Sequence, residues 1–336
     1  MTHAQLLRPV IVGYGRAGRD LHHRSLRTLA ERGTLRTGEV IVVDPRHPAD
    51  LLPGTTWFPT PGGAFDHLTD PTLGVFHITA PAGTHIPLAT QLLDLGARCL
   101  VLEKPIAGSH SEARQLAAQA ARRGAQLIPV SVWPASQITR QVTELLTAGR
   151  IGTPQMLYME QSKPRFRRTI TDRGHRNALE IELPHQVVLA LYLGGEVTEI
   201  TEVRTWSMPL PTKTLAAMGG VRLVLRHRSG ATSTLVSDLT SSIRIRRLRI
   251  TGTSGELRAD FPISSEDDFG QLRVTGEPGR RVVQDAPLTR FLELVYAHLD
   301  GTLERPPPCG LDIHLRAVEL VEAATLAVHG KEDLTC

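Results

Sequence analysis

The chain has 336 residues, of which 41% are hydrophobic and 21% are charged. This length exceeds what one hydrophobic core usually serves, so we expect two domains. No apolar run is long enough to cross a bilayer, and the N-terminus lacks a basic segment followed by an apolar stretch. The composition therefore predicts a cytoplasmic protein that does not bind membranes.

The formal net charge of +4 is small for this length. The sequence has no zinc-finger spacing and no basic-aromatic RNA motif, so we expect no nucleic-acid partner. The three cysteines, Cys99, Cys309 and Cys336, lie far apart and outside any metal-ligand spacing. They are expected to be free thiols, and we predict no metal site.

The first part of the chain alternates strand-like and helix-like segments, which is typical of a parallel sheet wrapped by helices. Short buried strands are expected at residues 10–12, 40–43, 74–79, 99–102 and 126–130. Helices are expected at residues 19–32, 86–95 and 112–123, the second stopped by Gly96 and the third capped by Ser109. We place the end of this first domain at residue 129.

Beyond this boundary, strands follow one another without intervening helices, which predicts an antiparallel sheet. The strand candidates are residues 155–161, 199–206, 221–226, 232–236, 243–251 and 271–275. Helices are expected at residues 136–148, from near Pro184, and at residues 289–299 and 311–329. Residues 130–336 therefore form an α+β domain with a large, mostly antiparallel open sheet.

A glycine-rich turn joins the first strand to the first helix: Gly13-Tyr14-Gly15-Arg16-Ala17-Gly18. The first glycine makes the tight turn, the second lets the backbone approach a pyrophosphate, and the third lets helix and strand pack closely. Asp44 ends the next strand, where a carboxylate can bind ribose hydroxyls. These features predict a Rossmann dinucleotide-binding domain over residues 1–129. Asp44 favours NAD because it repels the 2′-phosphate of NADP, whereas Arg46 could bind that phosphate, so NADP stays open.

Several further motifs resemble those of the Gfo/Idh/MocA family, which includes glucose-fructose oxidoreductase and inositol dehydrogenase. They are Thr79-Ala80-Pro81-Ala82-Gly83-Thr84-His85, Val101-Leu102-Glu103-Lys104-Pro105, Ala148-Gly149-Arg150-Ile151-Gly152, His185 with Leu193-Gly194, and Thr251-Gly252-Thr253-Ser254-Gly255-Glu256-Leu257. The resemblance spans essentially the whole chain. It implies that the two domains meet at the nicotinamide, over a cleft for a sugar, cyclitol or related polyol. It also implies that Thr79, Pro81, His85, Glu103 and Lys104 help to bind the cofactor.

The resemblance implies that Lys104 points into the cleft as a catalytic and substrate-binding residue. The carboxyl end of a parallel strand is where open α/β sheets bind ligands. A lysine there can donate a hydrogen bond to the oxygen that becomes a carbonyl and stabilise its developing charge. The alternative is a surface lysine after a strand. Pro105 would fix the following backbone, and a cis bond before it is often found in the family.

His185 is the candidate acid/base. Pro184 suits the start of a helix, which puts His185 in the first turn, where the helix dipole disfavours imidazolium. The family usually has an aspartate four residues earlier, where this chain has Ile181. Glu182 could orient His185 instead, on a segment expected to be extended so that Glu180 faces the other way. A structural histidine is the alternative.

The arginine-rich loop from residue 163 to 177 is expected to border the substrate site, with Arg165 and Asn177 as substrate-binding candidates beside Glu182 and His185. Arginine forks suit phosphate or carboxylate, so an anionic substrate is one reading and a solvated loop is the other. Arg244, Arg246, Arg247 and Arg249 are expected on an exposed or subunit-facing sheet surface. His22 and His23 are expected to be structural or close to the pyrophosphate.

The sequence thus predicts an NAD(P)-dependent oxidoreductase that transfers hydride to or from a secondary alcohol or ketone. An imine reductase and a non-catalytic dinucleotide sensor are the alternatives. The open sheet face of the second domain favours a homodimer or homotetramer.

Overall fold

The structure is a computed structural model that describes residues 6–35, 39–171, 175, 177–264 and 266–332. The chain divides into two compact units. The first contains residues 1–132 and 288–318, and the second contains residues 133–287 and 319–336. The segment 288–318 therefore belongs to the first unit although it follows most of the second unit in the chain. A helix pattern in sequence carries no signal of which unit it will cover.

The described strands of the first unit form a six-stranded parallel sheet in the order β3-β2-β1-β4-β5-β6. The strands are β1 (Arg8–Val12), β2 (Val40–Val43), β3 (Thr55–Phe58), β4 (Gly74–Ile78), β5 (Cys99–Leu102) and β6 (Gln126–Pro129). Both faces of β2, β4 and β5 are buried, which explains why β2 and β5 are entirely apolar and why His77 of β4 is buried as well. This order is that of a doubly wound dinucleotide-binding sheet, so the predicted Rossmann domain is confirmed.

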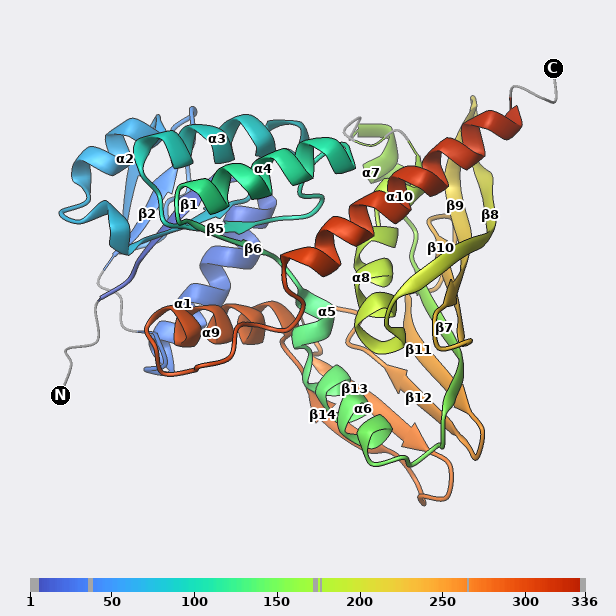
Figure 1. The fold of residues 1–336 in the computed structure, drawn as a ribbon. Helices are drawn as coiled ribbons and strands as arrows, with labels where there is room; N and C mark the ends of the chain where they lie inside the picture. The colour runs from blue at the N-terminus through green and yellow to red at the C-terminus, as the bar shows by residue number, and fades with distance from the viewer. Residues whose placement is uncertain (1–5, 36–38, 172–174, 176, 265, 333–336) are drawn as a thin grey trace. The chain divides into compact units, whose positions relative to one another are not determined.

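Helices cover both faces of this sheet (Figure 1). They are η1 (Ala17–His23), α1 (Arg24–Glu31), α2 (Pro61–His67), η2 (Pro71–Leu73), η3 (Ala82–Thr84), α3 (His85–Leu95), α4 (His110–Arg122) and α9 (Pro287–Leu299). Helices α3 and α4 lie side by side over one face, and α1 lies beside α9 on the other. There the hydroxyls of Ser25 and Thr289 are hydrogen-bonded at 3.0 Å.

Local signals position these helices as the sequence predicts. Gly96 has φ 102° and ends α3, because only glycine adopts this conformation without strain. Ser109 and Glu112 form a reciprocal capping box at the start of α4. The predicted helix at residues 19–32 is instead a π-helical turn, η1, that continues directly into α1.

The described strands of the second unit form an eight-stranded sheet in the order β14-β13-β12-β11-β7-β10-β9-β8. They are β7 (Pro154–Ser162), β8 (Val197–Pro209), β9 (Thr214–His227), β10 (Thr232–Asp238), β11 (Ile245–Gly252), β12 (Glu256–Asp260), β13 (Phe269–Val274) and β14 (Arg281–Gln284). Only β7 and β10 pair in parallel among these, so the predicted mostly antiparallel sheet is confirmed.

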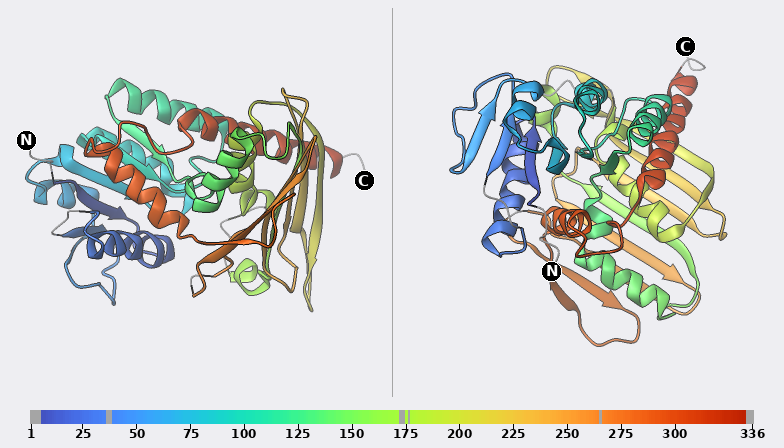
Figure 2. Two further views of the ribbon diagram at one scale, coloured as in Figure 1. Left: turned by 90° about the horizontal axis from the view of Figure 1, so that it is seen from below. Right: turned by 60° about the vertical axis from the view of Figure 1, so that its left-hand side comes forward.

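Figure 2 shows helices against one face of this sheet, where α8 packs on β7 and β10, and α6 packs on β12, β13 and β14. The helical segments are α5 (Val132–Ala135), α6 (Gln137–Thr147), α7 (Phe166–Thr171), η4 (Ala178–Glu180), α8 (Leu183–Gly194) and α10 (Leu311–Glu332), and the division between the units falls within α10. Across the described residues, no helix has the length and apolar character needed to cross a membrane.

Candidate functional site

The glycine turn after β1 is built as a cradle. A Cβ at Gly13 would lie 2.6 Å from the Cα of Ala80, and φ is 94° there, so no other residue fits. A Cβ at Gly18 would lie 2.2 Å from the carbonyl oxygen of Gly13. At Gly15, by contrast, no described residue has an atom within 4 Å of the Cβ position. The structure therefore needs Gly13 and Gly18 for its own packing and leaves the space at Gly15 open to a ligand. A pyrophosphate requires such an approach to the backbone.

Asp44 is fixed against this turn. Its Oδ2 accepts the backbone N–H of Tyr14 at 2.9 Å, and its Oδ1 accepts that of Arg46 at 3.0 Å. A carboxylate oxygen has a second lone pair, so each oxygen can still accept a ribose hydroxyl. Arg16 and Arg46 are exposed, and Ala17 begins the helix. The predicted cofactor residues from Gly13 to Arg46 thus lie together at the carboxyl ends of β1 and β2.

The loop after β4 closes the cradle. The Thr79 hydroxyl donates to the carbonyl of Gly13 at 2.7 Å, and Pro81 is exposed beyond it. The ring of His85 is buried, with its nitrogens 2.8 Å from the Pro105 carbonyl oxygen and 2.9 Å from that of Ala80. A neutral ring donates to one of these oxygens, and an imidazolium donates to both. His85 therefore ties the β4 loop to the β5 loop from inside the fold.

The segment Glu103-Lys104-Pro105 follows β5 directly, and its Lys104-Pro105 bond is cis. Glu103 accepts the backbone N–H of Lys104 through Oε2 at 3.1 Å, and its Oε1 lies 3.1 Å from Nε2 of His22. Lys104 itself is half-buried at the carboxyl edge of the parallel sheet. This is the edge at which β1 and β2 place the glycine turn and Asp44.

His22 and His23 are both buried in η1, as a structural role predicts. His23 Nδ1 lies 2.7 Å from the Tyr14 hydroxyl, and burial lowers the pKa of His23 to about 4. His22 Nδ1 lies 3.0 Å from Nδ1 of His77, whose Nε2 lies 2.9 Å from the hydroxyl of Tyr296 on α9. The contacts of His22 with His77 and of His77 with Tyr296 join residues of η1, β4 and α9. No local pattern in the sequence indicates contacts between such distant segments.

In the second unit, His185 is half-buried in the first turn of α8, with Pro184 before it. The expected extended segment at residues 180–182 is wrong. Residues 178–180 form a 3₁₀ turn, Ile181 is helical and buried, and Glu182 is the N-cap residue of α8. Alternation of faces therefore does not apply to Glu180 and Glu182. Glu182 is buried, and its carboxylate forms an ion pair with Lys163.

The predicted substrate-binding residues Arg165 and Asn177 are buried as well. Arg165 donates from Nη1 to the hydroxyl of Thr169 at 3.0 Å, so it does not lie on a solvated loop surface. The amide nitrogen and oxygen of Asn177 are both buried, and neither has a hydrogen-bond partner among the described residues. Buried amides are normally satisfied, so Asn177 is a candidate to bind a ligand.

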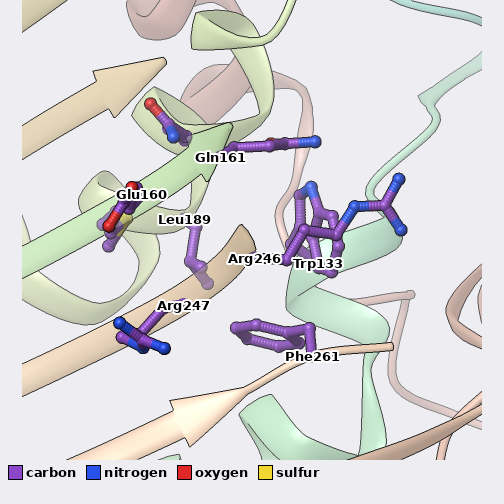
Figure 3. Close-up of a pocket in the computed structure, with 9 residues that line it drawn as sticks. Trp133, Glu160, Gln161, Leu189, Arg246, Arg247 and Phe261 are labelled. Carbon is purple, nitrogen blue, oxygen red and sulfur yellow. The ribbon is translucent and has the colours of Figure 1, made fainter. Parts of the chain in front are cut away.

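A small open pocket lies on the helix-covered face of the second sheet (Figure 3). Trp133, Met159, Gln161, Gln186, Arg246 and Phe261 are among the residues that line it. The guanidinium carbon of Arg246 is 5.5 Å from the centre of the Trp133 ring, and Nη1 of Arg246 donates to the carbonyl of Pro262 at 2.8 Å.

Arg246 therefore departs from the expected exposed surface. The strand period of two turns Arg246 to the same face as Leu248 and Ile250, while Arg247 and Arg249 face the other way. Burial lowers the pKa of the Arg246 guanidinium, and the Glu182 carboxylate opposes this effect. No pattern in the sequence indicates that Trp133 and Arg246 line one pocket, because these two residues are more than one hundred positions apart in the chain.

Comparison with known proteins agrees with this geometry. Residues 7–130 match the Gfo/Idh/MocA model, described as an oxidoreductase family with an NAD-binding Rossmann fold. These residues therefore resemble the NAD-binding domain of the Gfo/Idh/MocA oxidoreductase family. The chain is an NAD(P)-dependent oxidoreductase, and the open space at Gly15 beside the Asp44 carboxylate is compatible with such a cofactor. No curated protein matches the sequence at a significant level.

Solved structures share the fold across nearly the whole chain. One is an oxidoreductase from Agrobacterium radiobacter in complex with NAD+, L-tartaric acid and magnesium (16% identity, TM-score 0.74, covering 96% of each chain). Another is the WlbA dehydrogenase from Bordetella pertussis with NADH and UDP-GlcNAcA (17% identity, TM-score 0.74, 97% of this chain and 96% of that one). A third is KijD10, a 3-ketoreductase from Actinomadura kijaniata with TDP-benzene and NADP (17% identity, TM-score 0.73, 95% and 96%).

Proposed function

We propose that the protein transfers hydride between a nicotinamide dinucleotide and a secondary alcohol or ketone of a sugar, cyclitol or related polyol. The observation that carries this proposal is the position of Lys104, at the carboxyl end of β5 on the same sheet edge as the glycine turn and Asp44. When bound there, the nicotinamide accepts or donates the hydride. NAD is the preferred cofactor in this proposal, because the fixed Asp44 carboxylate repels a 2′-phosphate.

In this proposal Lys104 donates a hydrogen bond to the reacting oxygen, and His185 exchanges the hydroxyl proton. The ammonium group stabilises the negative charge that develops on that oxygen when its proton leaves. His185 lies in the first turn of α8, where backbone N–H groups have no helical partner and disfavour a positive ring. Its neutral ring can therefore accept a proton. Glu182, paired with Lys163, is the N-cap residue of α8, three residues before His185, and in this proposal it helps to orient the histidine.

We further propose that the polyol carries an anionic group. Arg246 lies at the pocket with one hydrogen-bond acceptor, the Pro262 carbonyl, among the described residues, so its remaining N–H groups can bind a carboxylate or phosphate. Gln186 lines the same pocket, and its Oε1, which has no partner among the described residues, can accept a hydrogen bond from a hydroxyl of the polyol. The ligands of the three related structures, a tartrate, a UDP-sugar and a TDP derivative, are all anionic.

The first test is a screen of acidic and neutral polyols, and of their ketones, for a change in nicotinamide absorbance with each cofactor. Lys104→Met and His185→Gln should each lower kcat by about 10²-fold or more while NADH binds within about threefold of the parent affinity. Lys213→Met, which removes an exposed lysine, is the matched control. Unchanged turnover in Lys104→Met would remove that residue from the reaction.

We also propose that the sheet face opposite α8 joins two copies of the chain, as a homodimer or within a homotetramer. Tyr158 and Val224 are half-buried on that face, flanked by the ion pairs of Arg247 with Asp260 and Arg222 with Glu202. Light scattering should give at least a dimer for the parent chain and a smaller species for Val224→Glu. A monomeric parent chain would exclude the interface.

A further inference from the structure

A continuous line of polar groups runs inside the first unit and ends at the Glu103-Lys104 turn. The Tyr296 hydroxyl lies 2.9 Å from Nε2 of His77, and Nδ1 of His77 lies 3.0 Å from Nδ1 of His22. Nε2 of His22 lies 3.1 Å from Oε1 of Glu103, whose Oε2 accepts the backbone N–H of Lys104. The side chains of His22 and His77 are fully buried, and Tyr296 is 2% exposed.

The carboxylate at one end decides where every proton in this line must be. An ionised carboxylate only accepts hydrogen bonds, so Nε2 of His22 carries the proton and donates to Glu103. Nδ1 of a neutral His22 then has only a lone pair, so the facing Nδ1 of His77 must carry a proton and donate to it. Nε2 of His77 is left as an acceptor for the Tyr296 hydroxyl. All of the hydrogen bonds therefore run in one direction, toward Glu103.

We propose that His22 and His77 are positioning residues that hold the Glu103 carboxylate against the backbone N–H of Lys104, with Tyr296 fixing the orientation of His77. This inference rests on the proposed role of Lys104 in the reaction. It assigns a function to a buried histidine pair that touches neither cofactor nor substrate. Through Glu103, these residues fix the position of the Lys104 backbone and therefore the point from which its side chain extends.

Burial favours the neutral forms of His77 and Tyr296 that this arrangement needs. Burial lowers the pKa of His77 well below its usual value, and burial raises the pKa of Tyr296, with a smaller contribution from Cys99. A second proton on Nδ1 of His22 would face the Nδ1–H of His77 at 3.0 Å, so His77 would have to change its tautomer. The hydrogen-bond geometry along the line therefore defines a single pattern of protons.

The pattern is testable without any turnover. Long-range proton–nitrogen NMR correlations of protein labelled in its histidine rings report which nitrogen carries each proton. We expect His77 as the Nδ1–H tautomer and His22 as the Nε2–H tautomer, with signals assigned by their loss in His77→Asn and His22→Asn. The opposite tautomers, or an imidazolium at neutral pH in either ring, would overturn the proposed line.

The positioning role is tested by a rescue pair. His77→Leu removes both nitrogens, whereas His77→Asn keeps an N–H at the position of Nδ1. His77→Leu should lower kcat/KM about tenfold with the Kd for NADH within about threefold, since a small displacement of a reacting group slows turnover strongly. His77→Asn should recover most of that loss. Equal kcat/KM in the parent and His77→Leu, or equal losses in both variants, would show that the line does not position Lys104.

Two controls keep the outcomes separate. If His77→Leu does not fold, Tyr296→Phe removes a single hydroxyl and should lower kcat/KM by about threefold, because His77 loses its fixed orientation. A parent enzyme with no activity on any polyol or ketone would contradict the proposed function. In that case the NMR tautomers of His22 and His77 still decide whether the proposed hydrogen bonds form. The kcat/KM values of His77→Leu and His77→Asn are then measured for the reaction that the enzyme does catalyse.

Discussion

The carboxylate of Asp44 accepts the backbone N–H of Tyr14 at 2.9 Å, so the residue expected to select the ribose also holds the phosphate turn. Asp44→Ala should lower NAD affinity about tenfold to a hundredfold, because hydrogen bonds to a charged group are lost. Affinity for NADP should fall less, since the repulsion of its 2′-phosphate disappears. Fluorescence titration with NADH and NADPH measures both, with the exposed Asp50→Ala as control. Equal losses for the two cofactors would contradict the assignment.

Gly15 and Gly18 should respond differently to the same added methyl group. Gly18→Ala places Cβ 2.2 Å from a backbone oxygen and should destabilise the folded chain. Gly15→Ala meets no described atom within 4 Å, so the melting temperature should stay near the parent value while NADH affinity falls at least tenfold. Gly62→Ala, another open position, controls for the substitution itself. Parent-like NADH affinity in Gly15→Ala would show that no pyrophosphate approaches there.

Arg246 should distinguish acidic from neutral substrates. Arg246→Met is expected to raise KM for an acidic polyol at least tenfold, because a paired hydrogen bond to an anion is lost, and to leave neutral polyols unchanged. The control variant, Arg249→Met, removes an arginine that does not line the pocket and, with it, an ion pair of Glu256 that contributes about 1 kcal/mol or less. The melting temperatures of both variants separate folding from recognition. A parallel rise in KM for acidic and neutral polyols in Arg246→Met would contradict anion binding.

Acid should destabilise the fold through its buried histidines. Burial holds the pKa of His23 at about 4 and lowers those of His77 and His227, against an ordinary value near 6.5. Between these values the unfolded chain binds more protons than the native one, so the free energy of unfolding falls as pH falls from about 6.5 to 4. Denaturant titrations across this range measure the slope. His23→Gln, which lacks one titrating ring, should reduce it, and an unchanged slope would exclude His23 as a cause.

Much of the fold follows from local sequence. The unbroken apolar segments at β2 and β5 are typical of strands buried on both faces, and Gly96 and Ser109 marked helix ends through their own chemistry. Strands β3, β12 and β14 were missed. Each has only two apolar residues in four or five positions, which is too few to show the period of a strand.

The parts of the candidate site that lie within one motif could be predicted from the sequence, whereas those formed by distant segments could not. The glycine turn is a single local unit, whereas the approach of Trp133 to Arg246 depends on which face of β11 each arginine takes. Treating the four arginines as one surface ignored the strand period. The expected extended stretch before α8 failed for a different reason, because the turn at residues 178–180 follows no hydrophobic period.

The place of α9 has a consequence for the order in which the protein is made. His77 emerges early in synthesis, but its partner Tyr296 lies 219 residues later, after the entire second sheet. Domains generally fold as units during synthesis. When residues 1–132 of the first unit have been synthesised, α9, which packs on their sheet, has not yet been made. A chain truncated after residue 287 would therefore contain the whole glycine turn, but the face of the parallel sheet that α9 covers would be exposed. A nucleotide-binding fragment would have to be produced with residues 288–318 joined back to it.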